Sequence, residues 1–338
     1  MIERIYIERE VEDHPRTKEI CGRFPKAVRI SCERYGEVFN RKAQSFRLQK
    51  RQPALVLAKK HGATVLAAPA GYGIGSQENF YFSHMLNCLY DCRYCFLQGM
   101  FRSAHYLHFV NYEDFQSGID EVLAASPRAH FFSGYDCDSL ALEQVTGFAC
   151  EFLPFFRARP QALVELRTKS AAVKPLLEVE PLANAVVAYS FTPAEIAEAL
   201  EHKAPPVERR IQAMEKLQAR GWRLGLRFDP VIYHPSYQEQ YRQLFRSIFE
   251  RLDSHRLHSV SLGPFRLPDS FFRNMVREFP DEALLAGPLV SRQGRVSYGE
   301  ELEQEMLAFI GDELRNYIDE GIFFPCVEVP ASCQGAGT

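Results

Sequence analysis

The most constraining feature of the chain is an alternation of short apolar strand patterns with amphipathic helix patterns, which begins near residue 80. The strand patterns cover 80–82, 130–132, 163–166, 185–189, 224–228 and 258–262. Helical periodicity occurs between and after them, at about 113–126, 139–157, 206–219 and 236–252. Strands that alternate with helices predict βαβ units and a parallel sheet. Six units are too few for a closed eight-stranded barrel, so we expect an α/β fold, a partial (βα)6 TIM-like barrel with its active site at the carboxyl ends of the strands.

Shorter elements flank this array and predict three parts in the chain. Strand patterns at 5–7, 54–58 and 64–68 and a glycine-rich loop at 69–75 indicate an N-terminal α/β extension over 1–75. The barrel is expected over 76–265, and a C-terminal cap over 266–338. The cap contains a turn-like segment at 292–295, a helix pattern at about 299–319 and a short strand pattern at 323–324. Residues 331–338 are expected to be disordered.

Composition excludes some classes of protein. The 338 residues contain no apolar run of membrane-spanning length and no signal peptide pattern, which favours a cytoplasmic protein without a membrane partner. A net charge of −3 argues against a dedicated nucleic-acid-binding domain, so such a partner requires a local patch. One basic run near the N-terminus is either such a patch or a solvated surface. It consists of Arg41, Lys42, Arg47, Lys50, Arg51, Lys59 and Lys60.

Three of the nine cysteines fall within eight residues, at Cys88, Cys92 and Cys95. They follow the first predicted barrel strand, where catalytic loops of such barrels lie. Thiolates bind iron–sulfur clusters and zinc, but a closed structural zinc site needs four ligands, and no companion pair follows here. A [4Fe–4S] cluster on three thiolates leaves one iron open to a ligand. The alternatives are three buried thiols or an incomplete zinc site.

The spacing C-x3-C-x2-C followed by an aromatic residue resembles the pattern of the radical S-adenosylmethionine superfamily. Around it, Tyr94-Cys95-Phe96-Leu97-Gln98 resembles the spore photoproduct lyases. Further segments resemble the same family in order: Asp138-Ser139-Leu140, Thr168-Lys169, Ser190, Glu201-His202-Lys203-Ala204-Pro205, Glu208-Arg209-Arg210-Ile211 and Pro230-Val231-Ile232-Tyr233. The resemblance covers about residues 50–300. It implies a radical lyase that repairs 5-thyminyl-5,6-dihydrothymine in DNA with a [4Fe–4S] cluster and S-adenosyl-L-methionine.

The resemblance also implies roles for individual residues. Cys88, Cys92 and Cys95 would ligate the cluster, and Lys169, Ser190 and Asp138 would belong to the cofactor site. Lys169 is otherwise a solvated lysine at a strand end, and Ser190 a helix N-cap with Glu195 further on. Arg227 and Asp229 end the fifth strand and are expected to pair with each other.

Two departures from the family lie in the radical relay. The lyases hold a hydrogen-donor cysteine in Ala-Cys-Thr-Ser-Asp, and here the segment reads Gly134-Tyr135-Asp136-Cys137-Asp138. Tyr135 therefore stands at the donor position, and Cys137 is the nearest thiol or, alternatively, a small buried hydrophobe. Phe96 replaces a tyrosine that relays the radical, while the neighbouring Tyr94 is kept and is a candidate catalytic residue with Tyr135 and Cys137. The hydrogen-return path, or the reaction, must therefore differ from that of the family.

The family's DNA-contacting hairpin corresponds to a stretch that holds Arg292, Arg295 and Tyr298 here. These residues are candidate nucleic-acid contacts or exposed turn residues. The expected partners are DNA and a one-electron reductant such as flavodoxin or ferredoxin, and the chain is expected to be a monomer. Two other functions remain open: a radical enzyme acting on another nucleotide, RNA or small molecule, and a non-catalytic iron–sulfur sensor.

Overall fold

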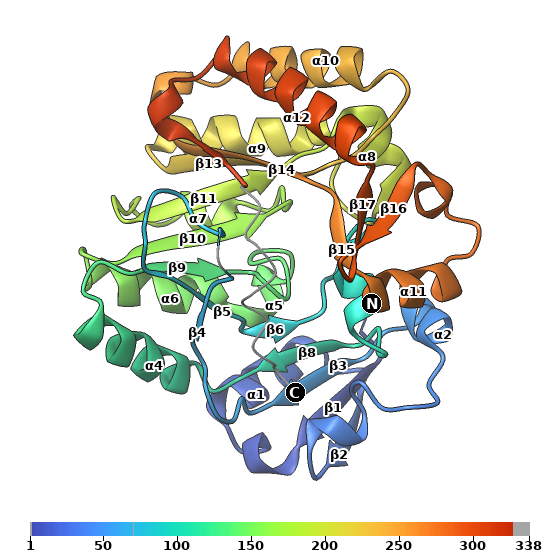
Figure 1. Ribbon diagram of the computed structural model, residues 1–338. Helices are drawn as coiled ribbons and strands as arrows, with labels where there is room; N and C mark the ends of the chain where they lie inside the picture. Colours follow the sequence, from blue (N-terminus) through green and yellow to red (C-terminus); the bar gives the residue numbers. More distant parts are fainter. Residues whose placement is uncertain (1, 70, 327–338) are drawn as a thin grey trace.

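The computed structural model describes residues 2–69 and 71–326. An eight-stranded sheet forms the body of the molecule (Figure 1), in the order β18-β14-β13-β11-β10-β9-β5-β4. Its parallel strands are β5 (Asn79–Phe82), β9 (His130–Ser133), β10 (Leu163–Thr168), β11 (Ala185–Ser190), β13 (Arg223–Val231), β14 (Leu257–Pro264) and β18 (Phe323–Pro325). The curled open sheet confirms the predicted partial barrel, and β18 extends it by one parallel strand.

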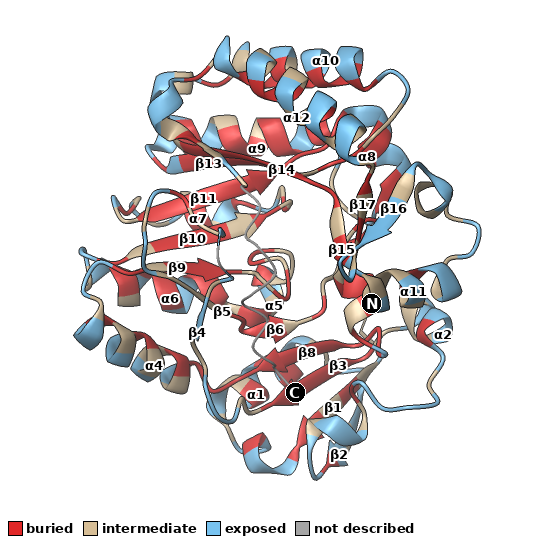
Figure 2. Cartoon of the chain, in the orientation of Figure 1, coloured by how far each residue is buried: buried red, intermediate tan, exposed pale blue. Residues whose placement is uncertain are grey.

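Helices cover the outer face of this sheet, as the sequence periodicity predicts. They are α4 (Tyr112–Ala125), α6 (Phe148–Arg157), α7 (Lys174–Leu177), α9 (Val207–Arg220), α10 (Tyr237–Phe249) and α12 (Glu300–Arg315). The short helices α5 (Glu143–Thr146) and α8 (Ala194–Leu200) follow β9 and β11. Figure 2 shows buried residues along the strands and exposed residues on the outer sides of α4, α10 and α12. The helix predicted at 139–157 is divided in two at Gly147, which has a φ of 61°.

A second sheet lies below the barrel in the view of Figure 1, in the order β2-β1-β3-β8-β6. Its strands are β1 (Arg4–Glu8), β2 (Val28–Cys32), β3 (Leu55–Ala58), β6 (Met85–Leu86) and β8 (Tyr106–Phe109), with α1 (Pro15–Arg23) and α2 (Phe46–Arg51) nearby in sequence. Because β6 and β8 follow residue 75, the predicted boundary at 75 does not separate the two sheets. The pattern at 64–68 forms β4 (Leu66–Ala67), which pairs with β5 of the barrel.

The C-terminal part adds a three-stranded antiparallel sheet beside the barrel opening. It consists of β15 (Arg266–Pro268), β16 (Leu289–Arg292) and β17 (Arg295–Tyr298), and α11 (Asp269–Glu278) follows β15. Residues 331–338, expected to be disordered, lie outside the described residues. Within the described part of the chain, no helix has the length and apolar character needed to cross a membrane.

Candidate active site

The three clustered cysteines lie on the loop between β6 and α3 (Leu97–Met100), and the loop is fixed at its centre. The short strand β7 (Asp91–Cys92) pairs antiparallel with β12 (Glu201–His202), which places Cys92 opposite Glu201. The backbone N–H of Arg93 donates to the carbonyl of Leu200 over 2.8 Å. The carboxyl end of α8 and the residues that follow it therefore hold the cysteine loop against the carboxyl ends of the barrel strands.

The donor set of this loop fits an iron–sulfur cluster. Cys88, Cys92 and Cys95 are free thiols, and burial raises the pKa of each above the ordinary cysteine value. Within residues 2–69 and 71–326, no three His, Cys, Asp or Glu side chains converge as they would on a single metal ion. Thiolates are the usual ligands of iron–sulfur clusters, in which each binds a different iron, and Cys88, Cys92 and Cys95 would hold such a cluster.

A buried ionic group lies next to the cysteine loop. The carboxylate of Glu201 accepts hydrogen bonds from the Tyr94 hydroxyl, from the Arg210 guanidinium and, over 3.0 Å, from the Thr192 hydroxyl. Glu201 is 4% exposed and Arg210 is 1% exposed. Burial raises the pKa of Glu201, but Lys169 and Arg210 outweigh it and hold the pKa below its ordinary value. The Tyr94 side chain is therefore held in place by Glu201, and its predicted catalytic role stays a prediction.

Asp138 fixes the end of β10 by hydrogen bonds to Thr168 and Lys169. Its Oδ1 accepts hydrogen bonds from the backbone N–H groups of Leu140 and Ala141 and from the Thr168 hydroxyl, at 2.7–2.9 Å. Its Oδ2 accepts the backbone N–H of Lys169 over 2.6 Å. Because the protein uses both oxygens, these contacts favour a positioning role for Asp138 behind Lys169.

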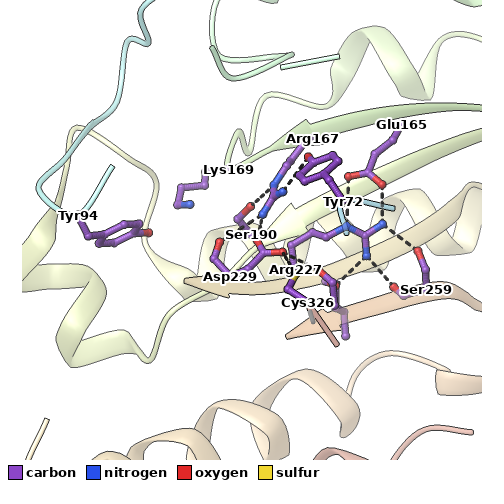
Figure 3. Close-up of polar contacts among 12 residues, drawn as sticks. Tyr72, Tyr94, Glu165, Arg167, Lys169, Ser190, Arg227, Asp229, Ser259 and Cys326 are labelled. Atoms are coloured by element: carbon purple, nitrogen blue, oxygen red, sulfur yellow. Dashed lines mark hydrogen bonds and ion pairs between the residues drawn. The ribbon is translucent and has the colours of Figure 1, made fainter. Parts of the chain in front are cut away.

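Lys169 directly follows β10, Ser190 ends the neighbouring strand β11, and both lie on the same side of the sheet edge (Figure 3). The Lys169 Nζ is 3.9 Å from Glu201 and 5.6 Å from the centre of the Tyr94 ring. The Ser190 hydroxyl accepts a hydrogen bond from the Arg167 Nε over 3.2 Å. Lys169 is partly buried by its neighbours, and α8 begins at Ala194 with Pro193 as its N-cap. The solvated-lysine and N-cap alternatives are therefore wrong.

Arg167 is the centre of a polar network that sequence analysis missed (Figure 3). Its guanidinium donates to the Tyr72 hydroxyl over 3.1 Å and forms an ion pair with Asp229. Arg227 instead forms a bidentate ion pair with Glu165 at 2.6 and 3.1 Å, with both side chains at most 2% exposed. The expected pairing of Arg227 with Asp229 is therefore wrong, because each of the two pairs with a residue of β10: Arg227 with Glu165, and Asp229 with Arg167.

The two candidate hydrogen donors lie in different places. The Tyr135 ring packs against Tyr81, Phe96 and Tyr72, with ring centres 4.4, 5.8 and 6.0 Å apart. Cys137 is 7% exposed and belongs to the apolar cluster of the N-terminal sheet, with Ile5, Met85 and Val110 among its members. Cys137 is thus packed as a buried hydrophobe, while Tyr135 contacts the residue that follows Cys95.

A further thiol lies at the active-site face. The backbone N–H of Cys326 donates to the carbonyl of Leu262 over 2.8 Å, next to β14. Its Sγ is 3.9 Å from the Asp229 Oδ2 (Figure 3). Burial raises the pKa of this thiol, against the opposing effect of Arg167 and Arg227. The position of Cys326 at the end of the last strand pattern predicts a second thiol near the site, and the contact of its Sγ with Asp229 agrees with that prediction.

The predicted nucleic-acid contacts are not all available. Arg292 is exposed and pairs with Glu300 over 3.0 Å, and Arg295 is partly exposed on β17. Tyr298 is 1% exposed and accepts a hydrogen bond from the backbone N–H of Tyr233 over 2.8 Å. Tyr298 therefore belongs to the core and offers no face to a base, because its side chain points inward from β17.

Glu201, Arg210 and Tyr72 lie in segments that were noted in the sequence, but no role was predicted for them. Glu201 and Arg210 lie in segments that resemble the family, but the sequence alone gave them no role. Tyr72 lies in the glycine-rich loop, where its hydroxyl could not be assigned a partner. These residues become recognisable only once the loops at the strand ends are brought together.

Comparisons with known proteins agree with this geometry. The family model described as "Spore photoproduct lyase" matches residues 77–276. The spore photoproduct lyase of Bacillus subtilis is 23% identical over 252 residues, covering 72% of each chain. That of Clostridium acetobutylicum is 20% identical over 292 residues, covering 84% of each chain.

Solved structures show the same fold over nearly the whole chain. A mutant spore photoproduct lyase with bound AdoMet and dinucleoside spore photoproduct has a TM-score of 0.84 at 16% identity, over 97% of this chain and 99% of that one. A spore photoproduct lyase complexed with dinucleoside spore photoproduct has a TM-score of 0.81 at 16% identity, over 97% and 98%. The partial barrel and both flanking parts thus recur together in these proteins.

Proposed function

The chain belongs to the spore photoproduct lyase family, and we propose that it is a radical S-adenosylmethionine lyase that repairs a thymine photoproduct in DNA. One observation carries the proposal: a loop with three free cysteines is fixed at the carboxyl ends of the barrel strands. Beside it lies a group of polar residues that we call the polar rim: Arg167, Lys169 and Ser190. Cys88, Cys92 and Cys95 would hold a [4Fe–4S] cluster there. When bound, the cluster and S-adenosylmethionine supply a 5′-deoxyadenosyl radical that abstracts hydrogen from the substrate.

The residues of the rim would bind and orient the cofactor. Lys169 offers a cation to a carboxylate, and the Ser190 hydroxyl and the Arg167 guanidinium offer donors and an acceptor beside it. Asp138 and Glu201 hold these groups in place from behind. Ser190 is buried, and the side chains of Arg167 and Lys169 are 20% and 14% exposed, so these residues also reduce the access of water to the site.

Hydrogen return to the substrate is the step in which this chain differs from its family. We assign the donor role to Tyr135, which stands at the donor position and contacts Phe96. A hydrogen atom passes from the phenolic O–H to the substrate carbon radical and leaves a tyrosyl radical, which one electron and one proton from the reductant reset. Cys326 is the second candidate, because its Sγ lies on the same face beside Asp229.

A set of matched variants tests this assignment. Tyr135→Phe is expected to lower repair at least about tenfold while S-adenosylmethionine cleavage continues, because only the returned hydrogen is lost. Cys137→Ala is expected to leave repair within about twofold of wild type, because its side chain packs in the N-terminal core. Repair of dinucleotide spore photoproduct and 5′-deoxyadenosine are measured in the same anaerobic reaction. Loss of repair in Cys326→Ala with full repair in Tyr135→Phe would transfer the role to the thiol.

Phe96 predicts how much cofactor the reaction consumes. With no O–H at this position, the radical has no relay back to 5′-deoxyadenosine, so about one S-adenosylmethionine should be consumed per repaired dimer. Phe96→Tyr places a hydroxyl next to Tyr135 and is expected to lower that ratio. The measured quantity is the ratio of 5′-deoxyadenosine formed to thymidylyl-thymidine released. A wild-type ratio well below one, with the same ratio in Phe96→Tyr, would contradict the interpretation.

The two other hypotheses make different predictions. A radical enzyme with another substrate would cleave S-adenosylmethionine and leave the photoproduct unchanged. A sensor would assemble the cluster and cleave nothing. The cytoplasmic location, the monomeric state and the contacts of Arg292 and Arg295 with DNA stay predictions.

A further inference from the structure

A basic cleft of about 330 Å³ lies outside the polar rim. It is lined by the loop before α2, by α3 and the residues after it, and by α11. Four cationic side chains line it, Arg41, Lys42, Arg102 and Arg277, with one carboxylate, Glu278. Among the described residues, Arg41, Lys42 and Arg102 form no ion pair with a carboxylate. The positive charge of the cleft is therefore largely uncompensated.

The cleft is built directly on the cysteine loop. Gln98 lines it from α3, and the backbone N–H of Gln98 donates to the carbonyl of Cys95 over 3.0 Å. On the other wall, Asn274 of α11 donates to the carbonyl of Gly99 over 2.8 Å. A Cβ at Gly99 would lie 2.2 Å from the carbonyl oxygen of Phe271, so only glycine permits this approach of the two helices. The cleft is thus rigidly connected to the segment that would hold the cluster.

Two side-chain amides that line the cleft have an unused oxygen atom. Gln98 is 4% exposed and Gln44 is half-buried, and the Oε1 atom of each has no hydrogen-bond partner within the described chain. A buried amide oxygen without a partner is costly unless an incoming donor satisfies it. The cleft therefore combines several cationic side chains with buried amide oxygens that lack a hydrogen-bond donor, as expected for a surface that binds a partner.

We propose that this cleft docks a small acidic one-electron carrier protein, which reduces the cluster held by Cys88, Cys92 and Cys95. The proposal rests on the proposed function, because a radical enzyme of this kind needs an electron from outside. Electron transfer weakens steeply with distance, and α3 is the first element after the cysteine loop. The whole chain has a net charge of −3, so an acidic carrier is attracted only where cations gather.

The position of the cleft favours a protein carrier over the nucleic acid. Its lining residues include none of the rim residues Arg167, Lys169 and Ser190, and neither Arg292 nor Arg295. DNA must reach the rim, where the reacting carbon lies, whereas a reductant needs only to approach the cluster. Complexes of redox carriers are also small, transient and salt-dependent, as expected for a compact cationic patch.

The test compares two double variants that change the net charge by the same amount. Lys42→Glu/Arg102→Glu reverses the charge of the cleft, and Lys26→Glu/Arg128→Glu reverses two exposed cations that line no part of it. Binding of an acidic bacterial flavodoxin to the cluster-loaded protein is measured by biolayer interferometry at low and high salt. The cleft variant is expected to bind at least about tenfold more weakly at low salt, with the control within about twofold of wild type.

Reduction of the cluster provides a second readout. Flavodoxin-driven reduction should slow by the same factor in the cleft variant, whereas dithionite-driven reduction should be unchanged, because a small reductant needs no docking site. Equal flavodoxin binding by the two double variants would overturn the proposal. So would a cleft variant that keeps flavodoxin binding and loses affinity for a DNA oligonucleotide. Weaker flavodoxin binding by the cleft variant, in an enzyme that leaves the photoproduct unrepaired, would support docking while the proposed substrate fails.

Discussion

Replacing Cys92 by alanine is expected to abolish S-adenosylmethionine cleavage, with a loss of at least about a thousandfold in the rate of 5′-deoxyadenosine formation. Cys92 is the central cysteine of the loop and lies opposite Glu201 in the β7–β12 pair. A cluster held by two thiolates in place of three would be poorly retained. Iron content and the visible absorption of the reconstituted protein measure cluster retention independently of activity.

Cys150→Ala is the matched control for this experiment. Cys150 is an exposed free cysteine on α6, and its removal changes the same number of thiols without touching the loop. This variant should load iron and cleave S-adenosylmethionine like the wild type. Full iron loading and activity in Cys92→Ala would contradict the assignment of the loop as the cluster site.

Of the variants proposed for this protein, Arg210→Met is expected to lose the most stability, about 3–5 kcal/mol in the free energy of unfolding. The substitution leaves the Glu201 carboxylate buried without its guanidinium partner and removes the hydrogen bond to the Ser190 carbonyl. Urea unfolding near neutral pH measures the change. Arg251→Met removes a more exposed arginine that pairs with Glu208 and Glu215, and should cost about 1 kcal/mol or less. Equal losses in the two variants would contradict a special role for the buried group.

The pH dependence of this loss has a defined sign. In the wild type, the pKa of Glu201 lies below its ordinary value of 4.5, so its contribution to stability is present above that pH and is lost as the pH falls through the folded-state pKa. Without Arg210, one of the two cations that lower the pKa of Glu201 is lost while the effect of burial remains, so we expect that pKa to rise and the variant to be penalised most when the carboxyl is ionised. The difference in stability between wild type and variant should therefore shrink as the pH approaches 4.5 from above. A difference that grows on acidification would exclude this explanation.

The elements of the barrel could be predicted from sequence because each has a local signal. All six predicted strand patterns form parallel strands of one sheet, from β5 to β14. The predicted strand at 323–324 forms β18, but its pairing with β14 depends on a chain reversal by α12 that no local pattern encodes. The same holds for β6 and β8, which join the N-terminal sheet although they follow the predicted boundary.

The site divides in a similar way. The cysteine spacing is local, so Cys88, Cys92 and Cys95 could be proposed as ligands from eight residues of sequence. The partners of Arg167 are not local: Tyr72 lies 95 residues away and Asp229 lies 62 residues away along the chain. Such contacts depend on which strand ends meet, and pairing rules for charged residues do not identify them. This is why Arg227 and Asp229, two residues apart, have different partners.

Sequence by itself determined the partial barrel, the cysteine loop and the family, because these depend on periodicity and on short spacings. Only the tertiary structure decided which side chains face the reaction. Cys137 is close in sequence to the donor position, yet it packs in the N-terminal core, while the distant Cys326 lies beside Asp229. The basic cleft likewise combines residues from 41–46, 98–102 and 274–278. The direction of a side chain depends on the packing of the whole chain, and short-range sequence patterns do not contain that information.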